Sequence, residues 1–141
     1  MTGVQTCALP ICSLYTFFFR ATPHPALSVF DAPDAFSTCT RRTRSNTPLQ
    51  ALTLLNDAGF HEVAQALAAR ILREGGTNDD ERLDQAFRLC VARRPSPLEK
   101  QRLAGLLARR LESGRGERKE HEAWTAVARV LMNLDETITR E

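Results

Sequence analysis

The segment TPLQALTLLNDAGFHEVAQALAARILREGG, residues 47–76, decides the fold because it contains two helices with recognisable ends. It opens with Thr47, Pro48 and, three residues after the threonine, Gln50. This order predicts a capping box at the start of a helix. The NDAG sequence then breaks that helix, and a second one with an apolar face runs to the glycine pair. Three leucines recur at helical spacing along the first helix: Leu49, Leu52 and Leu55.

Three further amphipathic helices are predicted downstream. Residues 79–93 carry acids in the first turn and arginines in the last, which suits the helix dipole, and Pro95 ends the helix. The sequence SPLE at 96–99 repeats the capping box and opens a fourth helix. A fifth, over about 118–133, places an apolar stripe inward: Trp124, Val127, Leu131 and Leu134. Because the connecting loops are short, we predict an all-α fold, an antiparallel bundle of about five helices.

Residues 13–47 precede the bundle and show little helical periodicity. Prolines interrupt them, and they are too aromatic for a disordered tail. We expect an irregular arm, with residues 48–141 forming the helical C-terminal part of the same, truncated domain. Tyr15 to Phe19 should cover a groove in the helices or contact a missing N-terminal half of the domain. Tyr15, Phe17 and Phe18 would then leave an apolar patch exposed in this chain.

The first twelve residues have a different character. Thr2–Ile11, TGVQTCALPI, resembles one translated reading frame of a short-read sequencing adapter. An export signal is a poorer interpretation, because no Lys or Arg precedes Arg20 and Pro10 breaks the apolar run. We therefore interpret residues 1–12 as an adapter artefact and expect the natural sequence to begin near Ser13.

The charge pattern argues against a nucleic-acid partner. The chain has 19 Lys and Arg against 17 Asp and Glu, a formal net charge of +2. Residues 48–141 hold fifteen of each sign, so the excess lies in the arm, whereas nucleic-acid proteins usually present a basic face. No apolar stretch approaches the roughly 18 residues of a transmembrane helix, so no membrane span is predicted.

Cys39 and Cys90 are the thiols expected in the natural protein, because Cys7 and Cys12 lie in or beside the adapter-like leader. Neither belongs to a C-x-x-C or C-x-x-C-H pattern, so we predict no zinc ribbon and no attached haem in this stretch. Cys90 falls on an apolar helical stripe and is interpreted as a buried, inert thiol. A Cys39–Cys90 disulfide would require an oxidising compartment, which composition does not fix.

The sequence HEVAQ at 61–65 resembles the zinc-protease helix HExxH, but Gln65 replaces the second histidine. An amide does not substitute for an imidazole nitrogen as a ligand, so we predict no metal site. His24 lies between prolines and His121 on the charged face of the last helix. Both are expected to be solvated rather than catalytic.

The sharpest polar cluster is RRTRSNT, residues 41–47. Guanidiniums, hydroxyls and an amide just before a helix N-terminus are typical of a site for phosphate, sulfate or carboxylate. The candidate anion-binding residues are Arg41, Arg42, Arg44 and Asn46. The interpretation that we favour is that the arginines pin the arm to the bundle by pairing with carboxylates such as Asp31, Asp34, Asp135 and Glu136.

Asp31 and Asp34 raise a similar choice. Their residue types suit an acid–base pair or a hard-cation site. Asp and Pro in FDAPD also organise a turn, which is the favoured interpretation, so we assign no catalytic residue. Near the C-terminus, Asn133 is interpreted as ending the last helix.

Five stretches resemble one family in order along the chain: SLYTFFFR, SVFDAPD, CTRRTRSNTPLQALTLLND, AFRLCVARRPSPLE and AWTAVARVLMNLDETITRE. They are similar to the C-terminal half of the planctomycete-type domain of unknown function 1553, also called planctomycete-specific domain one. The most specific pieces are RRxRxNTPLQAL, at Arg41–Leu52, and the ending NLDExITRE. Thr137 stands where the pattern has Phe, and Ala58 where Pro is common.

The resemblance implies a setting rather than an activity. Members are typically large exported proteins with cytochrome-c-like haem modules and another uncharacterised domain upstream, often associated with polysaccharide or sulfated-glycan breakdown. It therefore implies an extracytoplasmic location, and haem only in missing upstream modules. It supplies no catalytic residues to transfer.

We hypothesise that residues 13–141 form a structural or binding module whose partners are the missing half of its domain and, as a candidate ligand, an anionic glycan. The alternative is a glycan-active enzyme in which the three arginines of residues 41–44 hold an anionic sugar while Asp31 or Asp34 acts as acid or base. That alternative requires these side chains to converge on one cleft.

Overall fold

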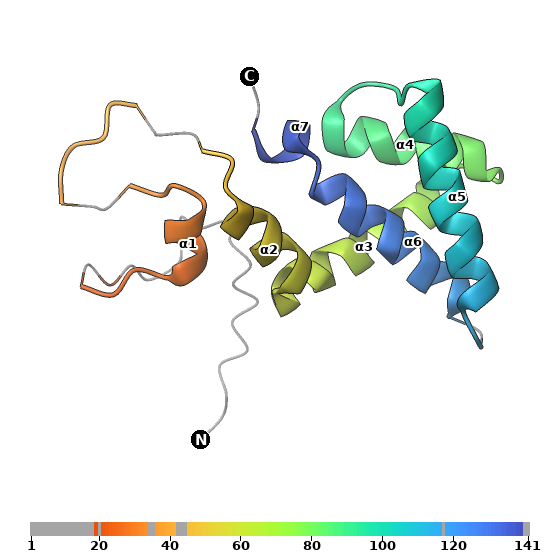
Figure 1. Ribbon diagram of the computed structural model, residues 1–141, viewed down its shortest axis with the longest axis horizontal. Coiled ribbons are helices and arrows are strands. Elements are labelled where there is room, and N and C mark those ends of the chain that lie inside the picture. Colours follow the sequence, from red (N-terminus) through yellow and green to blue (C-terminus); the bar gives the residue numbers. More distant parts are fainter. Residues whose placement is uncertain (1–18, 20, 34–35, 42–44, 117, 140–141) are drawn as a thin grey trace.

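The computed structural model describes residues 19, 21–33, 36–41, 45–116 and 118–139, and its regular secondary structure in these ranges is entirely helical. The all-α prediction is confirmed (Figure 1). The five predicted helices are present among the described residues, and two short helices flank them. The helices are α1 (Pro25–Val29), α2 (Pro48–Asn56), α3 (Ala58–Glu74), α4 (Asp79–Val91), α5 (Pro97–Ser113), α6 (Lys119–Met132) and α7 (Asp135–Ile138).

Both predicted capping boxes are present. At α2 the Thr47 hydroxyl accepts from the Gln50 backbone amide, and the Gln50 side chain accepts from the Thr47 amide. Ser96 and Glu99 make the same reciprocal pair at α5. Each box satisfies amides that have no partner within the helix, and each is followed by proline at the first helical position. Local sequence alone therefore sets where α2 and α5 begin.

Helix α4 ends two residues earlier than predicted. Ala92 adopts a left-handed conformation, with φ of 59°, and its amide donates to the Arg88 carbonyl. This conformation costs a non-glycine residue about 1 kcal/mol. Because the helix stops before Arg93, that side chain is free to reach the starts of the next helices.

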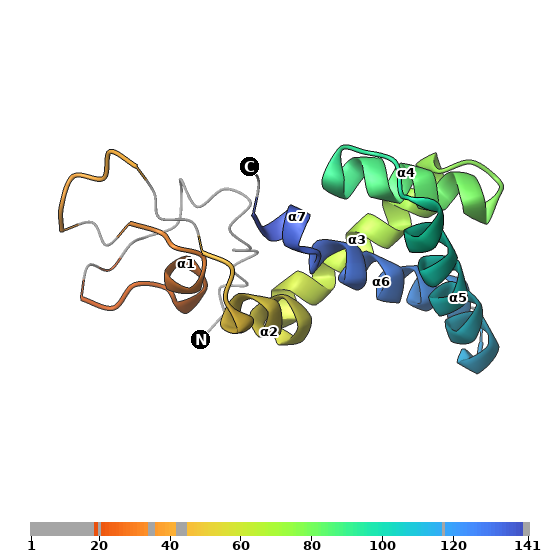
Figure 2. The same cartoon turned by 45° about the horizontal axis from the view of Figure 1, so that its top comes forward.

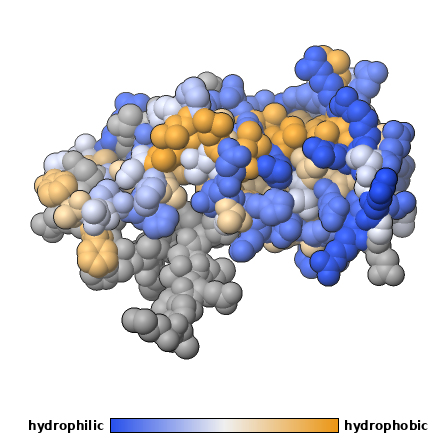
Figure 3. Space-filling model, turned by 60° about the horizontal axis from the view of Figure 1, so that its bottom comes forward, coloured by the Kyte–Doolittle hydropathy of each residue, from blue (hydrophilic) through white to orange (hydrophobic). Residues whose placement is uncertain are grey.

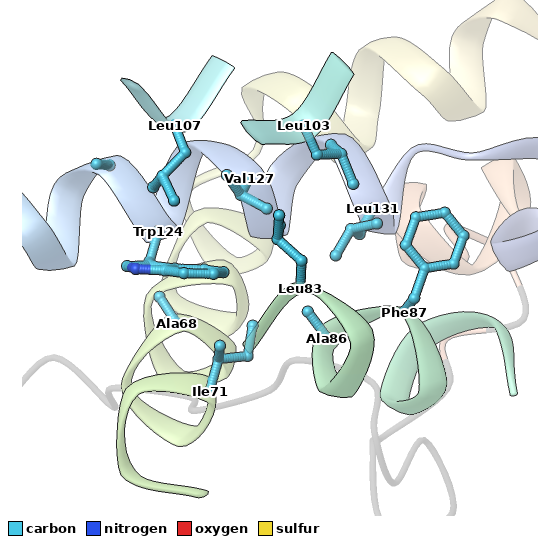
Figure 4. Packing of buried hydrophobic residues seen from close by; sticks show 11 residues of the cluster. Ala68, Ile71, Leu83, Ala86, Phe87, Leu103, Leu107, Trp124, Val127 and Leu131 are labelled. Atoms are coloured by element: carbon cyan, nitrogen blue, oxygen red, sulfur yellow. The ribbon is translucent and has the colours of Figure 1, made fainter. Parts of the chain in front are cut away.

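The core lies between α3, α4, α5 and α6 (Figure 4). Helices α3 and α6 make the most extensive contact and cross one another in both ribbon views (Figures 1 and 2). Trp124 is the largest fully buried side chain, followed by Phe87. Of the predicted α6 stripe, Leu134 is only half-buried. The other three members are buried: Trp124, Val127 and Leu131.

The arm lies at one end of the molecule, beside α2, and is not irregular throughout (Figures 1 and 2). Its PALSV sequence forms α1, which ends in a turn where the amides of Asp31 and Ala32 donate to the carbonyls of Ser28 and Leu27. This pattern needs a left-handed residue after the helix, and Asp31 supplies it with φ of 56°. Asp31 thus occupies a turn, as expected, whereas Asp34 lies outside the described residues.

Candidate functional site

Gln50 organises the junction between the arm and α2. Its side chain is buried, with 1% exposed. The amide nitrogen donates to the Val29 carbonyl at 2.9 Å and to the Ser45 hydroxyl at 3.1 Å, while the amide oxygen accepts from the Thr47 backbone at 3.1 Å. One amide thereby joins the end of α1, the segment before α2 and the first turn of α2.

The carboxylate of Asp31 completes this junction. It accepts from the Ser45 backbone amide at 2.8 Å and from the Ser45 hydroxyl at 2.7 Å, and Gln50 Nε2 lies 3.4 Å away. These bonds bring together residues that are 14 positions apart in the chain. Asp31 is therefore used to hold the two ends of a loop, a structural role.

The four candidate anion-binding residues divide into two groups. Arg42 and Arg44 lie outside the described residues, and Arg41 is exposed. Asn46 donates through its side-chain nitrogen to Asp135 of α7 at 2.7 Å. The arm is thus attached to α7 through an amide, and the three-arginine anion site stays a prediction.

Arg93 is a junction residue that the sequence did not single out. It forms two hydrogen bonds to Glu99 at 2.7 and 2.9 Å and two to Glu136 at 2.7 and 2.8 Å, and its guanidinium lies 5.1 Å from the centre of the Phe87 ring. Glu136 therefore pairs with Arg93, whereas it was expected from the sequence to pair with an arginine of the arm. The sequence did contain one indication of the Arg93–Glu99 contact. Glu99 is a capping residue six places after Arg93, across a turn that contains two prolines.

Hydrogen bonds between Arg93, Glu99 and Glu136 shift the pKa values of all three side chains. Hydrogen bonds from Arg93, the largest cause, and from the Ser96 backbone lower the pKa of Glu99 to about 2. The bonds from Arg93 likewise lower the pKa of Glu136, and both carboxylates raise the pKa of Arg93. The three side chains stay charged over the neutral range and tie the end of α4 to α5 and α7.

Helix α2 presents leucines to solvent. Leu49 is 58% exposed and Leu52 is 55% exposed, and their spacing of three places them on one face of the helix. Single exposed leucines are ordinary, and these two differ only in lying on the same face of one helix. Figure 3 shows apolar side chains gathered in a band between hydrophilic ones on one face of the molecule.

A cavity of about 440 Å³ lies between α3, the end of α5 and α6. Within HEVAQ, the Gln65 amide nitrogen lies 3.3 Å from His61 Nε2. His121 is half-buried rather than fully solvated, because its Nε2 is 3.1 Å from the Gln65 carbonyl oxygen. His24 is exposed and accepts a hydrogen bond at the start of α1. Neither Arg41 nor Asp31, both of which the structure describes, is among the residues that line this cavity.

The two thiols differ in environment. Cys90 packs half-buried against the core, and burial raises its pKa to about 11, as expected of an inert thiol. Cys39 is exposed, and both are free cysteines in this structure. Among the residues that the structure describes, no group of three or more His, Cys, Asp or Glu could hold a metal ion, and no helix is long and apolar enough to cross a membrane.

Residues 9–107 match the model of the family PSD1, protein of unknown function (DUF1553). The matched range contains both capping boxes, Arg93 and the whole arm–α2 junction, and it ends within α5. The C-terminal stretch AWTAVARVLMNLDETITRE lies beyond it. No curated protein and no solved structure matches the chain. Since the match covers well over half of the sequence, the chain belongs to the PSD1 (DUF1553) family of proteins of unknown function.

Proposed function

We propose that this chain is a helical docking module of a larger exported protein, and that α2 is the face onto which the preceding part of the same domain packs. The observation that carries the proposal is the exposure of Leu49 and Leu52 on one face of α2. Covering both leucines would contribute about 2 to 3 kcal/mol.

The surroundings of α2 support a docking role. The capping box fixes the start of the helix, and the Gln50 amide anchors the arm against it, so this face is organised before a partner arrives. A preorganised surface loses less conformational entropy on binding.

The preceding polypeptide is the natural occupant because the arm leads directly into α2. Phe30 of the arm packs on Phe60 of α3, with ring centres 5.6 Å apart, so the chain approaches α2 from an anchored position. A tethered partner acts at a high effective concentration, roughly millimolar, so a modest apolar face is enough to hold it. The resemblance to C-terminal halves of the family further supports a preceding half.

The wider setting rests on the family resemblance. It supports an extracytoplasmic location, haem in upstream modules, and a link to polysaccharide breakdown with an anionic glycan as candidate ligand of Arg41, Arg42, Arg44 and Asn46. The docking proposal does not depend on these features.

The exposed face is tested by replacing both leucines with glutamine, Leu49→Gln together with Leu52→Gln. The double variant is expected to bind less of a hydrophobic fluorescent dye and to self-associate less in sedimentation, because an apolar patch has been removed. Leu98→Gln is the matched control, because Leu98 is 57% exposed at the start of α5. Equal dye binding and self-association in the double variant and the wild type would count against the proposal.

A further inference from the structure

The cavity between α3, α5 and α6 is lined by more cationic than anionic side chains. Arg110 and Arg129 line it, together with His61 and His121, and Glu122 is the one acid among the lining residues. Its volume of about 440 Å³ falls in the range of small-molecule sites. The cavity is built from helices of the core, so it is separate from both the arm and the exposed face of α2.

The Arg129 guanidinium is anchored by one hydrogen bond and has other N–H donors without an acceptor in the described part of the chain. Its Nη2 donates to the Leu55 carbonyl at the end of α2, while its buried Nε has no acceptor in the described part of the chain. A guanidinium offers five N–H donors, and a buried unpaired donor is costly. Because Nε itself is enclosed by protein, a ligand in the cavity would contact the guanidinium through its other N–H groups.

The histidine contacts orient both rings. The backbone carbonyl of Gln65 can only accept, so His121 Nε2 carries a hydrogen. The side-chain amide nitrogen of Gln65 can only donate, so His61 Nε2 is assigned as an acceptor. A neutral His61 therefore carries its hydrogen on Nδ1, where it is a donor. Two arginines against a single carboxylate among the lining residues favour an anion.

We propose that this cavity binds the oxyanion group of a small molecule, with Arg110 and Arg129 as its cationic contacts. Sulfate, phosphate and carboxylate groups share the required chemistry, since each accepts several charge-assisted hydrogen bonds. The site uses none of the residues of the arm's arginine cluster.

The test is a titration of the whole chain with inorganic sulfate, inorganic phosphate or acetate, each against sodium chloride at equal ionic strength. Thermal unfolding and the ring C–H resonances of the histidines are followed. At ten times Kd, the effective anion is expected to raise Tm by about 5 °C relative to chloride. Response to sulfate and phosphate alone identifies a tetrahedral ligand group, and response to acetate identifies a carboxylate.

The matched variants are Arg110→Gln and Arg109→Gln, which remove the same charge from adjacent positions of α5. Arg110 lines the cavity, whereas the Arg109 Nε donates to the Gly105 carbonyl of its own helix at 3.2 Å. Arg110→Gln should weaken binding about tenfold or more, and Arg109→Gln should leave it unchanged. Equal losses in the two variants, or no response beyond that of chloride, would overturn the proposal. Because the leucines of α2 do not line the cavity, failure here leaves the docking proposal standing.

Discussion

The Gln50 side chain both caps α2 and holds the arm against it. Its oxygen completes the capping box of α2, and its nitrogen binds the end of α1 and the Ser45 hydroxyl. An apolar replacement of similar size would leave the Val29 carbonyl and the Thr47 amide without these partners. Leaving a buried polar group unpaired costs about 1 to 3 kcal/mol.

Gln50→Leu should therefore release the arm while leaving the bundle folded. We expect faster amide hydrogen exchange at residues 26–32 and little change within α3 to α6, because the core contacts do not involve Gln50. Gln101→Leu, at an exposed position of α5, is the control. The same exchange pattern in both variants would show that Gln50 does not hold the arm.

Only half of this residue's role was predictable. The order TPLQ predicts the bond to Thr47, because both partners lie within four residues. The bond to Val29 spans 21 positions and depends on how the arm folds back. Similarly, Asn46 was identified as a polar candidate, but its partner Asp135 lies 89 positions away.

At the scale of the elements, the ends of helices decide what their neighbours contact. The left-handed Ala92 stops α4 before Arg93, and Arg93 then joins α5 through Glu99 and α7 through Glu136. Helix α7 has four residues and needs such outside contacts, since a single turn does not form stably by itself.

Glu99→Gln separates the charge of this contact from the capping role, because glutamine also serves in a capping box. The pKa of Glu99 in the folded chain, about 2, lies below its ordinary value of 4.5. Its stabilisation is therefore present above pH 4.5 and is lost as the pH falls from about 4.5 to about 2. Because the side chain is 35% exposed, solvent limits the contribution to about 1 kcal/mol or less.

The expected result is a smaller loss of unfolding free energy between pH 5 and about pH 2.5 in Glu99→Gln than in the wild type. Urea unfolding at both pH values measures it. Glu112→Gln, at an exposed position of the same helix, should follow the wild type. If Glu99→Gln loses as much stability as the wild type across this window, the Arg93 contact contributes nothing.

Element prediction worked where signals are local and strong. Capping residues, prolines and apolar stripes placed the five longer helices, because each signal acts within one or two turns. The short helices α1 and α7 were not predicted, because five and four residues are too few to show helical periodicity. The leucine spacing in α2 correctly indicated a helix, but it could not reveal that Leu49 and Leu52 would remain uncovered.

At the scale of the whole molecule, the core and the outer face are separated along the chain. Helices α3 to α6 bury Trp124, Phe87 and Ile71 in one cluster. Helices α1 and α2 lie on the side of α3 away from α5 (Figure 1), where they contribute polar junctions and exposed leucines. This division suits a module that folds around its own core and offers its N-terminal end to another part of the same protein.

The most direct test of the proposed docking role is the affinity of the chain for the proposed preceding part of its domain, expressed as a separate polypeptide and titrated calorimetrically. If α2 is the docking face, binding should weaken about 30- to 150-fold when Leu49 and Leu52 are both replaced by glutamine, the equivalent of about 2 to 3 kcal/mol. Leu98→Gln should bind like the wild type. Equal affinity for the wild type and the double variant, or no binding by the wild type, would contradict the assignment of α2 as the docking face.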